Sequence, residues 1–363
     1  MRIVFMGTPR FAVLSLSRLL EEGHDVAAVV TQPDKPRGRG REVYPPPVKV
    51  LALDKGVRIL QPENVNLEGP ITELTALAPE LIIVVAYGAI LRKPLLSLPS
   101  SGCINLHASL LPRLRGVAPI NWAIILGERV TGVTTMWMNE KVDAGEIIFH
   151  REVPILPEEN AGELTERMAA VGSELLSETL KAVARGTAPR LPQDISLASY
   201  APRLKKEDGV VDWSKDAVSL SNLIRGVTPW PGAQTSFKAA PLKILKAAVV
   251  SEAGEPAAPP DGGSDAAADG RSAPGEFGRG AYAGAPGRVA SAARGGDARL
   301  TAPVPPGVVL GVREGAPDEA GIVVATGRGA LRLVTVQPSG KRPMAAAEFA
   351  RGRRLSRGDR FGS

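Results

Sequence analysis

The sequence predicts an α/β protein in two parts: an N-terminal doubly wound, mostly parallel sheet of the Rossmann-like kind and a smaller C-terminal β-barrel. Two features predict the first part, a strand–turn–helix–strand opening over residues 2–31 and a continuous apolar run at 81–86. Such a run is typical of a central parallel strand that is buried on both faces. Short alternating segments after residue 233 predict the barrel.

The opening of the chain predicts a strand at 2–6, a turn at Gly7-Thr8-Pro9, a helix at 10–22 and a strand at 26–31. This order matches the start of a dinucleotide-binding domain, but the turn has one glycine where that fingerprint needs three. Without those glycines the backbone cannot approach a pyrophosphate closely. We therefore expect no nicotinamide or flavin site.

The rest of the N-terminal part continues the alternation of helices and strands. Apolar spacing predicts helices at 47–55, 71–78, 118–126 and 161–184, and strands at 58–60, 81–86 and 131–138. Ligands in an open α/β sheet bind beyond the carboxyl ends of its strands. The site is therefore expected near Tyr87 and Gly88, which follow the run at 81–86, and near a polar stretch at 102–116.

Residues 199–209 are typical of a linker, and a second pattern begins after them. We place the domain boundaries at 1–203, 204–209 for the linker and 210–363. In the last of these the pattern predicts a helix at 219–226 and strands at 235–250, 308–312, 321–326 and 330–336. Short strands with turn residues between them favour a small barrel or sandwich, and we predict an OB-like barrel.

The stretch at 251–306 interrupts this C-terminal domain. It consists mainly of Ala, Gly, Pro, Ser and charged residues, and Leu300 is its only leucine. Such a composition cannot offset the entropy of ordering by burial. We predict a disordered insertion whose deletion leaves folding and activity largely intact.

Composition narrows the class of protein. The chain has 363 residues, 44% of them hydrophobic, and no apolar run long enough to span a membrane. The first residues predict a strand instead of a secretion signal. The single cysteine, Cys103, excludes an internal disulfide and a multi-cysteine zinc site, which fits the reducing cytoplasm. We also expect no membrane partner and, since no protein partner is implied, a monomer. The net charge of +6 favours a polyanionic partner.

The polar stretch at 102–116 is the first candidate for chemistry. Asn105 and His107 lie two residues apart, so on a strand their side chains share one face. Pro112 and Gly116 then fix the path of a loop. The alternative interpretation is structural, because a buried histidine is often a core residue and an asparagine beside a turn is often a cap.

Asp143 is the second candidate, in a loop that follows the strand predicted at 131–138. An aspartate before a small residue and a glycine is commonly a turn residue. If the two strands are neighbours, its carboxylate can reach the imidazole of His107. A carboxylate there favours the imidazolium or fixes the tautomer of the ring.

The segment at 32–42 is rich in Gly, Pro and positive charge and is expected to be a mobile loop. Its cationic side chains are Lys35, Arg37, Arg39 and Arg41. They form either a solvated surface or an arm that contacts phosphates. The residues alone leave both interpretations open.

Several blocks of sequence resemble one family. They read Asn-Leu-His-Ala-Ser-Leu-Leu-Pro-Arg at 105–113, Val-Asp-Ala-Gly at 142–145, Pro-Trp-Pro-Gly-Ala at 229–233 and Gln-Pro-Ser-Gly-Lys-Arg at 337–342, with shorter matches at 4–9, 32–34, 202–204 and 207–209. The first block is similar to that of all 10-formyltetrahydrofolate-dependent formyltransferases. The blocks near the C-terminus resemble those of the family branch that acts on methionyl-tRNA.

The resemblance implies transfer of a formyl group from 10-formyltetrahydrofolate to the α-amino group of methionyl initiator tRNA. It places the catalytic trio on Asn105, His107 and Asp143 of a formyltransferase domain, 1–203, and makes 210–363 the tRNA-binding domain. The folate pocket would include Ser109, Leu110, Leu111 and Pro112, with backbone near Tyr87 and Gly88. The tRNA contacts would include Lys35, Arg37, Arg39, Arg41, Lys206, Lys341 and Arg342.

The chemistry of the trio agrees with this. Attack of an amine on a formyl carbonyl creates an oxyanion, to which Asn105 and a protonated His107 can donate hydrogen bonds. Asp143 would orient His107 and relay protons, so no metal or covalent nucleophile is required. Cys103 shares their face but is expected only to pack.

Three departures from the family pattern are visible: Leu114 in place of a frequent aromatic, Asn139 in place of a frequent acid, and the insertion at 251–306.

Two alternative functions remain. The same trio would serve a formyltransferase acting on a small amine, such as an amino-sugar nucleotide or a purine precursor. A non-catalytic RNA-binding protein that retains the fold is the other.

Overall fold

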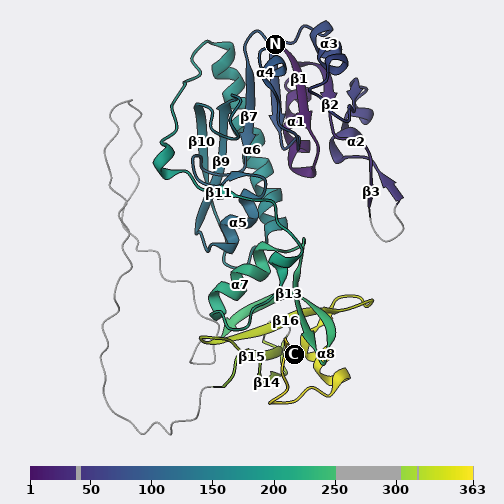
Figure 1. Ribbon diagram of the computed structural model, residues 1–363, viewed down its shortest axis with the longest axis vertical. Coiled ribbons are helices and arrows are strands. Elements are labelled where there is room, and N and C mark those ends of the chain that lie inside the picture. The colour runs from purple at the N-terminus through teal and green to yellow at the C-terminus, as the bar shows by residue number, and fades with distance from the viewer. Residues whose placement is uncertain (38–41, 251–303, 317–318, 363) are drawn as a thin grey trace.

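The computed structural model describes residues 1–37, 42–250, 304–316 and 319–362, and it has two parts joined end to end (Figure 1). The N-terminal part carries a large mixed sheet, and the C-terminal part carries a separate antiparallel one. The predicted α/β class is therefore confirmed. Most of the predicted insertion, 251–303, lies outside the described residues, and so do Arg39 and Arg41.

Among the described residues the N-terminal sheet has seven strands in the order β10-β9-β7-β6-β1-β2-β5. They are β1 (Arg2–Gly7), β2 (Asp25–Val30), β5 (Ile59–Leu60), β6 (Leu81–Val85), β7 (Cys103–His107), β9 (Val130–Trp137) and β10 (Ile147–Pro154). The five strands from β7 to β5 are parallel, whereas β9 runs antiparallel to both of its neighbours. The sheet is thus mostly parallel, as predicted.

The two faces of this sheet bury different side chains. Ile3, Ile83 and Ile104 belong to the core on one face, and Ile82 and Cys103 belong to the core on the other. All five residues of β6 are buried, which explains the continuous apolar run in the sequence. The covering helices are α1 (Val13–Glu21), α2 (Pro47–Asp54), α3 (Glu68–Ala76), α4 (Lys93–Leu96), α5 (Pro119–Ile125) and α6 (Ala161–Ala184).

Helix α6 has the bounds that the sequence predicts. Its start is fixed by a capping box, in which the side chain of Asn160 accepts from the backbone N–H groups of Gly162 and Glu163, and Glu163 accepts from the N–H of Asn160. Apolar residues at helical spacing, among them Leu164, Met168 and Leu175, pack against the sheet.

The described part of the C-terminal sheet is antiparallel in the order β12-β13-β16-β15-β14, with β17 beside β16. Its strands are β12 (Ala233–Phe237), β13 (Ala240–Val250), β14 (Val309–Arg313), β15 (Gly321–Ala325), β16 (Ala330–Pro338) and β17 (Met344–Ala345), and its helices are α7 (Ala217–Gly226) and α8 (Ala346–Arg353). The C-terminal tail joins the two edges, because Phe361 bridges to Phe237 of β12 and Arg360 bridges to Val308 before β14. This closure approaches the barrel that the sequence predicts.

Helix α7 lies at the junction of the two parts (Figure 1). The side-chain amide of Asn121 on α5 donates to the carbonyl of Gly226 at 2.7 Å, and the backbone N–H of Gly162 donates to the carbonyl of Thr228 at 3.2 Å. The half-buried guanidinium of Arg225 donates to the carbonyls of Leu156 and Glu159. Within the described ranges, no helix has the length and apolar character that a membrane crossing demands.

The predictions of a linker at 199–209 and of a mobile loop at 32–42 are wrong in part, because both segments contain short strands. Tyr200–Ala201, inside the segment interpreted as a linker, forms strand β11 and pairs with β8 (Arg115–Gly116). The loop that contains β8 needs backbone partners, and β11 supplies them. The flanks of the basic segment also pair, as β3 (Lys35–Arg37) with β4 (Glu42–Tyr44). This short hairpin projects away from the sheet (Figure 1).

Candidate active site

Strand β7 presents Asn105 and His107 on one face of the N-terminal sheet, as their spacing predicts. Both side chains are largely buried, since Asn105 is 8% exposed and His107 is 6% exposed. Cys103 lies on the same strand, where its thiol donates to the carbonyl of Leu96 at 3.6 Å. Burial raises the pKa of the Cys103 thiol to about 12, so the group stays protonated and packs as an apolar side chain.

The imidazole of His107 lies between two different segments. Its Nε2 is 3.0 Å from the carbonyl oxygen of Leu114. A carbonyl oxygen only accepts, so Nε2 carries a proton and donates it. The other ring nitrogen, Nδ1, lies 3.7 Å from Oδ1 of Asp143. Nδ1 is therefore the ring nitrogen that is left for a substrate.

Asp143 reaches this position by an indirect route. Because β9 is antiparallel to β7, its last residue, Trp137, pairs with Ile104 near the start of β7. The loop at 138–146 must therefore fold back along the sheet edge. Gly145 permits the return, since a Cβ atom there would lie only 1.6 Å from the carbonyl oxygen of Trp137. Asp143 itself has a φ of 48°, in the left-handed region.

The carboxylate of Asp143 has two fixed partners. Its Oδ2 accepts from the backbone N–H of Gly116 at 2.8 Å, and its Oδ1 accepts from the side-chain amide of Asn105 at 3.4 Å. The three predicted catalytic side chains thus meet at one place. The second amide N–H of Asn105 has no hydrogen-bond partner among the described residues, and Nδ1 of His107 is 3.7 Å from Oδ1 of Asp143, so both are suited to contact a reacting group.

The loop at 109–117 is held by hydrogen bonds within the chain. The hydroxyl of Ser109 donates to the carbonyl of Arg113 at 2.6 Å. Thr134 on β9 bonds the loop twice, since its hydroxyl donates to the carbonyl of Ser109 and accepts from the N–H of Leu111. The peptide bond between Leu111 and Pro112 is cis. These contacts give the loop one shape.

The residues predicted to line the folate pocket differ in how far their side chains are exposed to a ligand. The side chains of Ser109, Leu111 and Tyr87 are buried, whereas Leu110 and Pro112 are partly exposed and Gly88 is exposed. Tyr87 is 2% exposed, and burial raises its pKa to about 12. Ser109 and Tyr87 are left with backbone groups for a ligand, and the carbonyl of Tyr87 already accepts from Thr8.

A cavity of about 890 Å³ lies beside the loop that carries Asp143. Its lining includes Val142 and Ala144, which flank Asp143, and residues that the sequence analysis did not single out: Lys93, Leu96, Met138, Arg115, Gln193 and Tyr200. A mixed apolar and polar lining of this size is typical of small-molecule sites. No local pattern marks these residues, because they come from distant parts of the chain.

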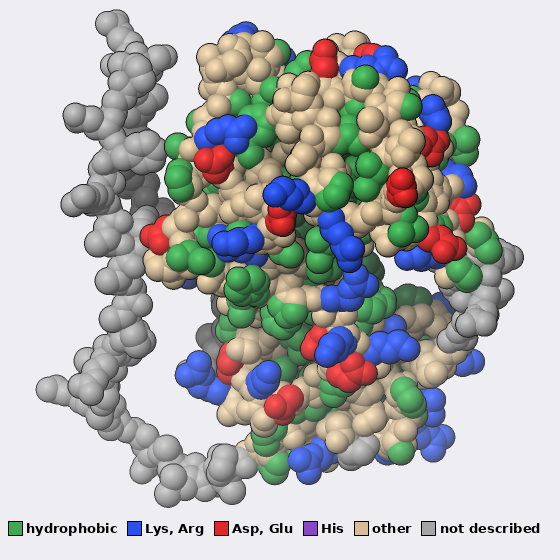
Figure 2. Space-filling view, turned by 45° about the horizontal axis from the view of Figure 1, so that its top comes forward, with side chains coloured by type: hydrophobic (Ala, Val, Ile, Leu, Met, Phe, Trp, Pro, Cys, Tyr) green, Lys and Arg blue, Asp and Glu red, His purple; other side chains and the backbone are tan. Residues whose placement is uncertain are grey.

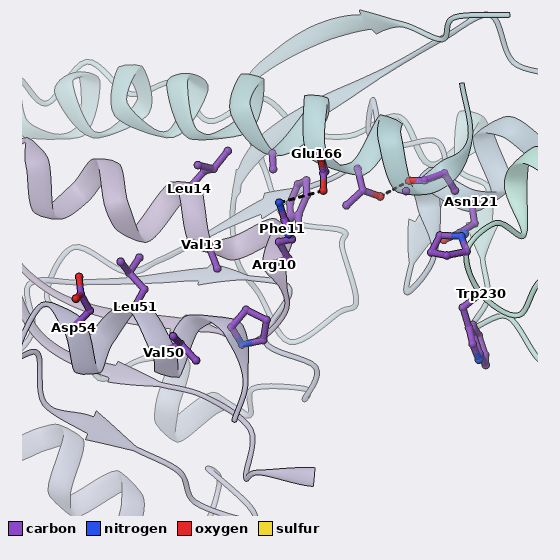
Figure 3. A pocket seen from close by; sticks show the side chains of 16 residues that line it. Arg10, Phe11, Val13, Leu14, Val50, Leu51, Asp54, Asn121, Glu166 and Trp230 are labelled. Carbon is purple, nitrogen blue, oxygen red and sulfur yellow. Dashed lines mark hydrogen bonds and ion pairs between the residues drawn. The ribbon is translucent and has the colours of Figure 1, made fainter. Parts of the chain in front are cut away.

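A second, more apolar groove of about 1130 Å³ lies between α1, α2, α6 and the turn that contains Trp230 (Figure 3). Arg10 and Glu166, which line the groove, form an ion pair at 3.3 Å, and Trp230 lies at the end of the groove away from Asp54 and Leu51 (Figure 3). None of the three predicted catalytic side chains lines this groove. The trio does not line the other cavity either, but Val142 and Ala144, on both sides of Asp143, do, so that cavity is the one that adjoins the trio.

The described basic residues lie apart from the trio and on the surface. Lys35, Lys206, Lys341 and Arg342 are exposed, and within the described ranges none of them forms an ion pair. Lys341 and Arg342 line a cleft of about 530 Å³ together with Lys243 and no acidic residue. Lys and Arg side chains lie on both parts of the molecule with acidic ones among them (Figure 2).

No group of three or more His, Cys, Asp or Glu side chains suited to a metal ion occurs in the part of the chain that the structure describes.

Comparisons with known proteins match both parts of the chain to one family. Residues 1–180 match the formyl transferase family, and residues 203–354 match the C-terminal domain of formyl transferases. A methionyl-tRNA formyltransferase of Geobacter metallireducens is 41% identical over 360 residues, covering 99% of this chain and 98% of the relative. That of Moorella thermoacetica is 43% identical over 362 residues, covering 100% and 99%.

Solved structures share the fold at lower identity. A sugar 3N-formyl transferase, WlaRD, crystallised in the presence of dTDP and 5-N-formyl-THF, matches with a TM-score of 0.55 and 20% identity, over 69% of this chain and 87% of that one. HypX from Aquifex aeolicus in complex with tetrahydrofolic acid matches with a TM-score of 0.52 and 17% identity, over 96% and 47%. At these identities the likeness supports the fold.

Proposed function

The chain belongs to the formyl transferase family, and we propose that it transfers the formyl group of 10-formyltetrahydrofolate to the α-amino group of methionine on initiator tRNA. The observation that carries this proposal is the meeting of Asn105, His107 and Asp143 beside a ligand-sized cavity. Relatives named methionyl-tRNA formyltransferase along nearly the whole chain support the acceptor.

The cavity of about 890 Å³ fits the formyl donor. Leu96 and Met138 offer apolar contacts for a flat ring system, and the exposed Lys93 offers positive charge for carboxylates. Formyltetrahydrofolate supplies an activated formyl carbon there. The remaining predicted donor contacts, Ser109, Leu110, Leu111, Pro112, Tyr87 and Gly88, are proposed to act mainly through the backbone.

The residues of the trio divide the chemistry between them. Attack of the amine places negative charge on the formyl oxygen, and Asn105 can donate one amide N–H to it. His107 can donate a second hydrogen bond from Nδ1 when it is protonated, because Nε2 is committed to Leu114. Asp143, 3.7 Å from Nδ1, holds the imidazole in place and can accept the proton that the amine loses. When the oxyanion collapses, the bond between the formyl carbon and N10 of the donor breaks, and N10 takes up a proton as tetrahydrofolate leaves.

The tRNA would be held by cations of both parts. We propose contacts from the basic segment at 32–42, with Lys35, Arg37, Arg39 and Arg41, and from Lys206, Lys341 and Arg342. Replacing Lys341 and Arg342 by alanine together should raise the KM for tRNA several-fold at 150 mM salt and leave kcat unchanged. An unchanged KM would contradict this part, and Arg39→Ala tests the basic segment in the same way.

The proposal is tested by a formylation assay with purified protein, 10-formyltetrahydrofolate and methionyl initiator tRNA, with free methionine in parallel. Formyl-methionyl-tRNA should form, and His107→Ala and Asp143→Asn should abolish it. His150→Ala is the matched control, since His150 is exposed on β10. If no product forms with tRNA although the donor binds, the acceptor is a small amine and the proposal is wrong.

Two further statements rest on the same proposal. The chain is proposed to act as a monomer, because one copy supplies the whole trio, and sedimentation at a mass other than 38.0 kDa would contradict this. It is proposed to act in the cytoplasm, where charged initiator tRNA is found.

A further inference from the structure

The backbone around Asp143 is held by a side chain that lies 50 residues away. The side-chain amide of Gln193 donates to the carbonyl of Asp143 at 3.0 Å and to the carbonyl of Gly145 at 2.7 Å. A carboxamide has two N–H donors, so both bonds can form at once. Gln193 therefore joins the residue that carries the carboxylate to the glycine that lets the loop return.

The other end of this amide is fixed by Arg115. The Nε and Nη2 atoms of Arg115 donate to Oε1 of Gln193 at 3.2 and 2.6 Å. This pair fixes which way the amide of Gln193 points, because a flipped amide would set its N–H groups against the guanidinium. Arg115 thus directs both donors of Gln193 toward the loop.

The buried side chain of Arg115 lowers the stability of the fold. It is only 4% exposed, and it forms no ion pair with any residue that the structure describes. A buried guanidinium without a carboxylate partner costs free energy, and an apolar residue would pack there more favourably. Such a residue is typical of a site where geometry matters more than stability.

Arg115 and the next residue hold Asp143 at two points. The backbone N–H of Gly116 donates directly to the carboxylate of Asp143 at 2.8 Å, and Arg115 reaches the backbone of Asp143 through Gln193. Both residues belong to β8, which β11 fixes in turn: the N–H of Arg115 donates to the carbonyl of Ser199 at 2.8 Å. The carboxylate and its backbone are therefore tied to one short strand.

We propose that Gln193 and Arg115 are positioning residues, which hold the carboxylate of Asp143 at the distance from His107 that formyl transfer requires. This inference rests on the proposed function for its catalytic consequence. Its structural part, the placement of Asp143 against the imidazole, stands independently and has its own readout. Displacement of a catalytic group by about 1 Å can lower a rate about 100-fold.

Gln193→Glu is the sharpest test. The variant keeps the size of the side chain and its bond to Arg115, but it replaces both N–H donors with an oxygen that the two carbonyls repel. We expect kcat to fall about 10- to 100-fold, with the KM values for tRNA and donor within twofold and the melting temperature nearly unchanged. Gln193→Met, which loses both functions but keeps the volume, should behave alike if the glutamate variant fails to fold.

Nuclear magnetic resonance of the imidazole protons gives the readout that does not depend on activity. The chain has three histidines, His24, His107 and His150, and single substitutions assign their signals. In Gln193→Glu the signals of His107 should move while those of the other two stay. If the unaltered protein does not formylate methionyl-tRNA but the His107 signals move in Gln193→Glu, then Gln193 does position Asp143 against His107 and the proposed function is wrong.

One control variant and a pair of substitutions at Arg115 complete the test. Gln61→Met is the matched control for Gln193→Met, because Gln61 is also partly buried and its amide also donates twice, to the backbone carbonyl of Gln32 and to Oδ1 of Asp34, away from the trio. Arg115→Lys keeps the charge but not the paired geometry, so its loss of kcat should be smaller than that of Arg115→Met. Unchanged His107 signals and kcat in Gln193→Glu, or a raised donor KM with normal kcat, would overturn the proposal.

Discussion

Strand β7 and the loop at 138–146 meet at the same site, but the chain holds them in different ways. In β7, Asn105 is fixed by backbone pairing with β6 on one side and β9 on the other, and His107 is paired with β9. The loop has no such ladder around Asp143. It is placed by the N–H of Gly116 and by the side chain of Gln193.

Because of this difference, substitutions in the strand and in the loop should have different effects. A strand inside a sheet keeps its register when one side chain is removed, so substitutions in β7 remove a function and leave the geometry. A loop held by a few hydrogen bonds moves when any of its partners is removed. The following substitutions test this contrast, in order of decreasing expected effect.

Among these substitutions, Asn105→Ala should have the largest effect on turnover. Removal of one donor to a developing oxyanion costs about 100- to 1,000-fold in rate, and the strand pairing of β7 should keep the fold intact. The measurements are kcat with saturating substrates and the thermal melt. Retention of a tenth or more of the turnover would contradict the assigned role of the Asn105 amide.

Gly116→Ala should disturb the loop side through the backbone. Gly116 has a φ of 113°, and a Cβ atom would lie 2.8 Å from the carbonyl oxygen of Ala201. We expect a loss of about 1–3 kcal/mol in unfolding free energy and a fall in kcat, because the N–H donor to Asp143 shifts. Urea unfolding and turnover measure both effects.

Gly186→Ala is the control for that strain. It has a positive φ of 69° at the end of α6, but no atom lies within 4 Å of the added Cβ. It should lose stability by about 1 kcal/mol and keep full activity. Equal losses of activity in the two glycine variants would show that global strain, not the position of Asp143, causes the defect.

Ser199→Ala should give a smaller effect on the same side of the site. The hydroxyl of Ser199 accepts from the N–H of Leu114, whose carbonyl in turn accepts from His107. Removing the acceptor costs about 1 kcal/mol, and kcat should fall only a few-fold, because β8 and β11 remain paired. Ser356→Ala, at an exposed turn far from the trio, should leave kcat unchanged.

Cys103→Ala should have the smallest effect, although Cys103 lies on β7 two residues before Asn105. Turnover should stay within twofold, because the thiol packs and does not react. Burial raises the pKa of the Cys103 thiol to about 12, so the folded protein should resist thiol reagents at pH 8. Labelling should accelerate along the urea unfolding curve, and equally fast labelling of folded protein would refute the inert role.

Local patterns predicted much of this molecule. The continuous apolar run predicted β6, the helical spacing predicted α6, and the period of two predicted the shared face of Asn105 and His107. In each case neighbouring residues in the sequence are also neighbours in the element, so the signal lies within a few positions.

The partners of Asp143 were decided only by the tertiary structure. No local signal joins Gln193 to residues 50 positions earlier, makes β11 from part of a linker, or sets β9 antiparallel to β7. These contacts depend on how distant backbone groups satisfy one another once the sheet has formed. The sequence by itself determined which side chains can perform the chemistry, and the long-range hydrogen bonds decided where the carboxylate stands.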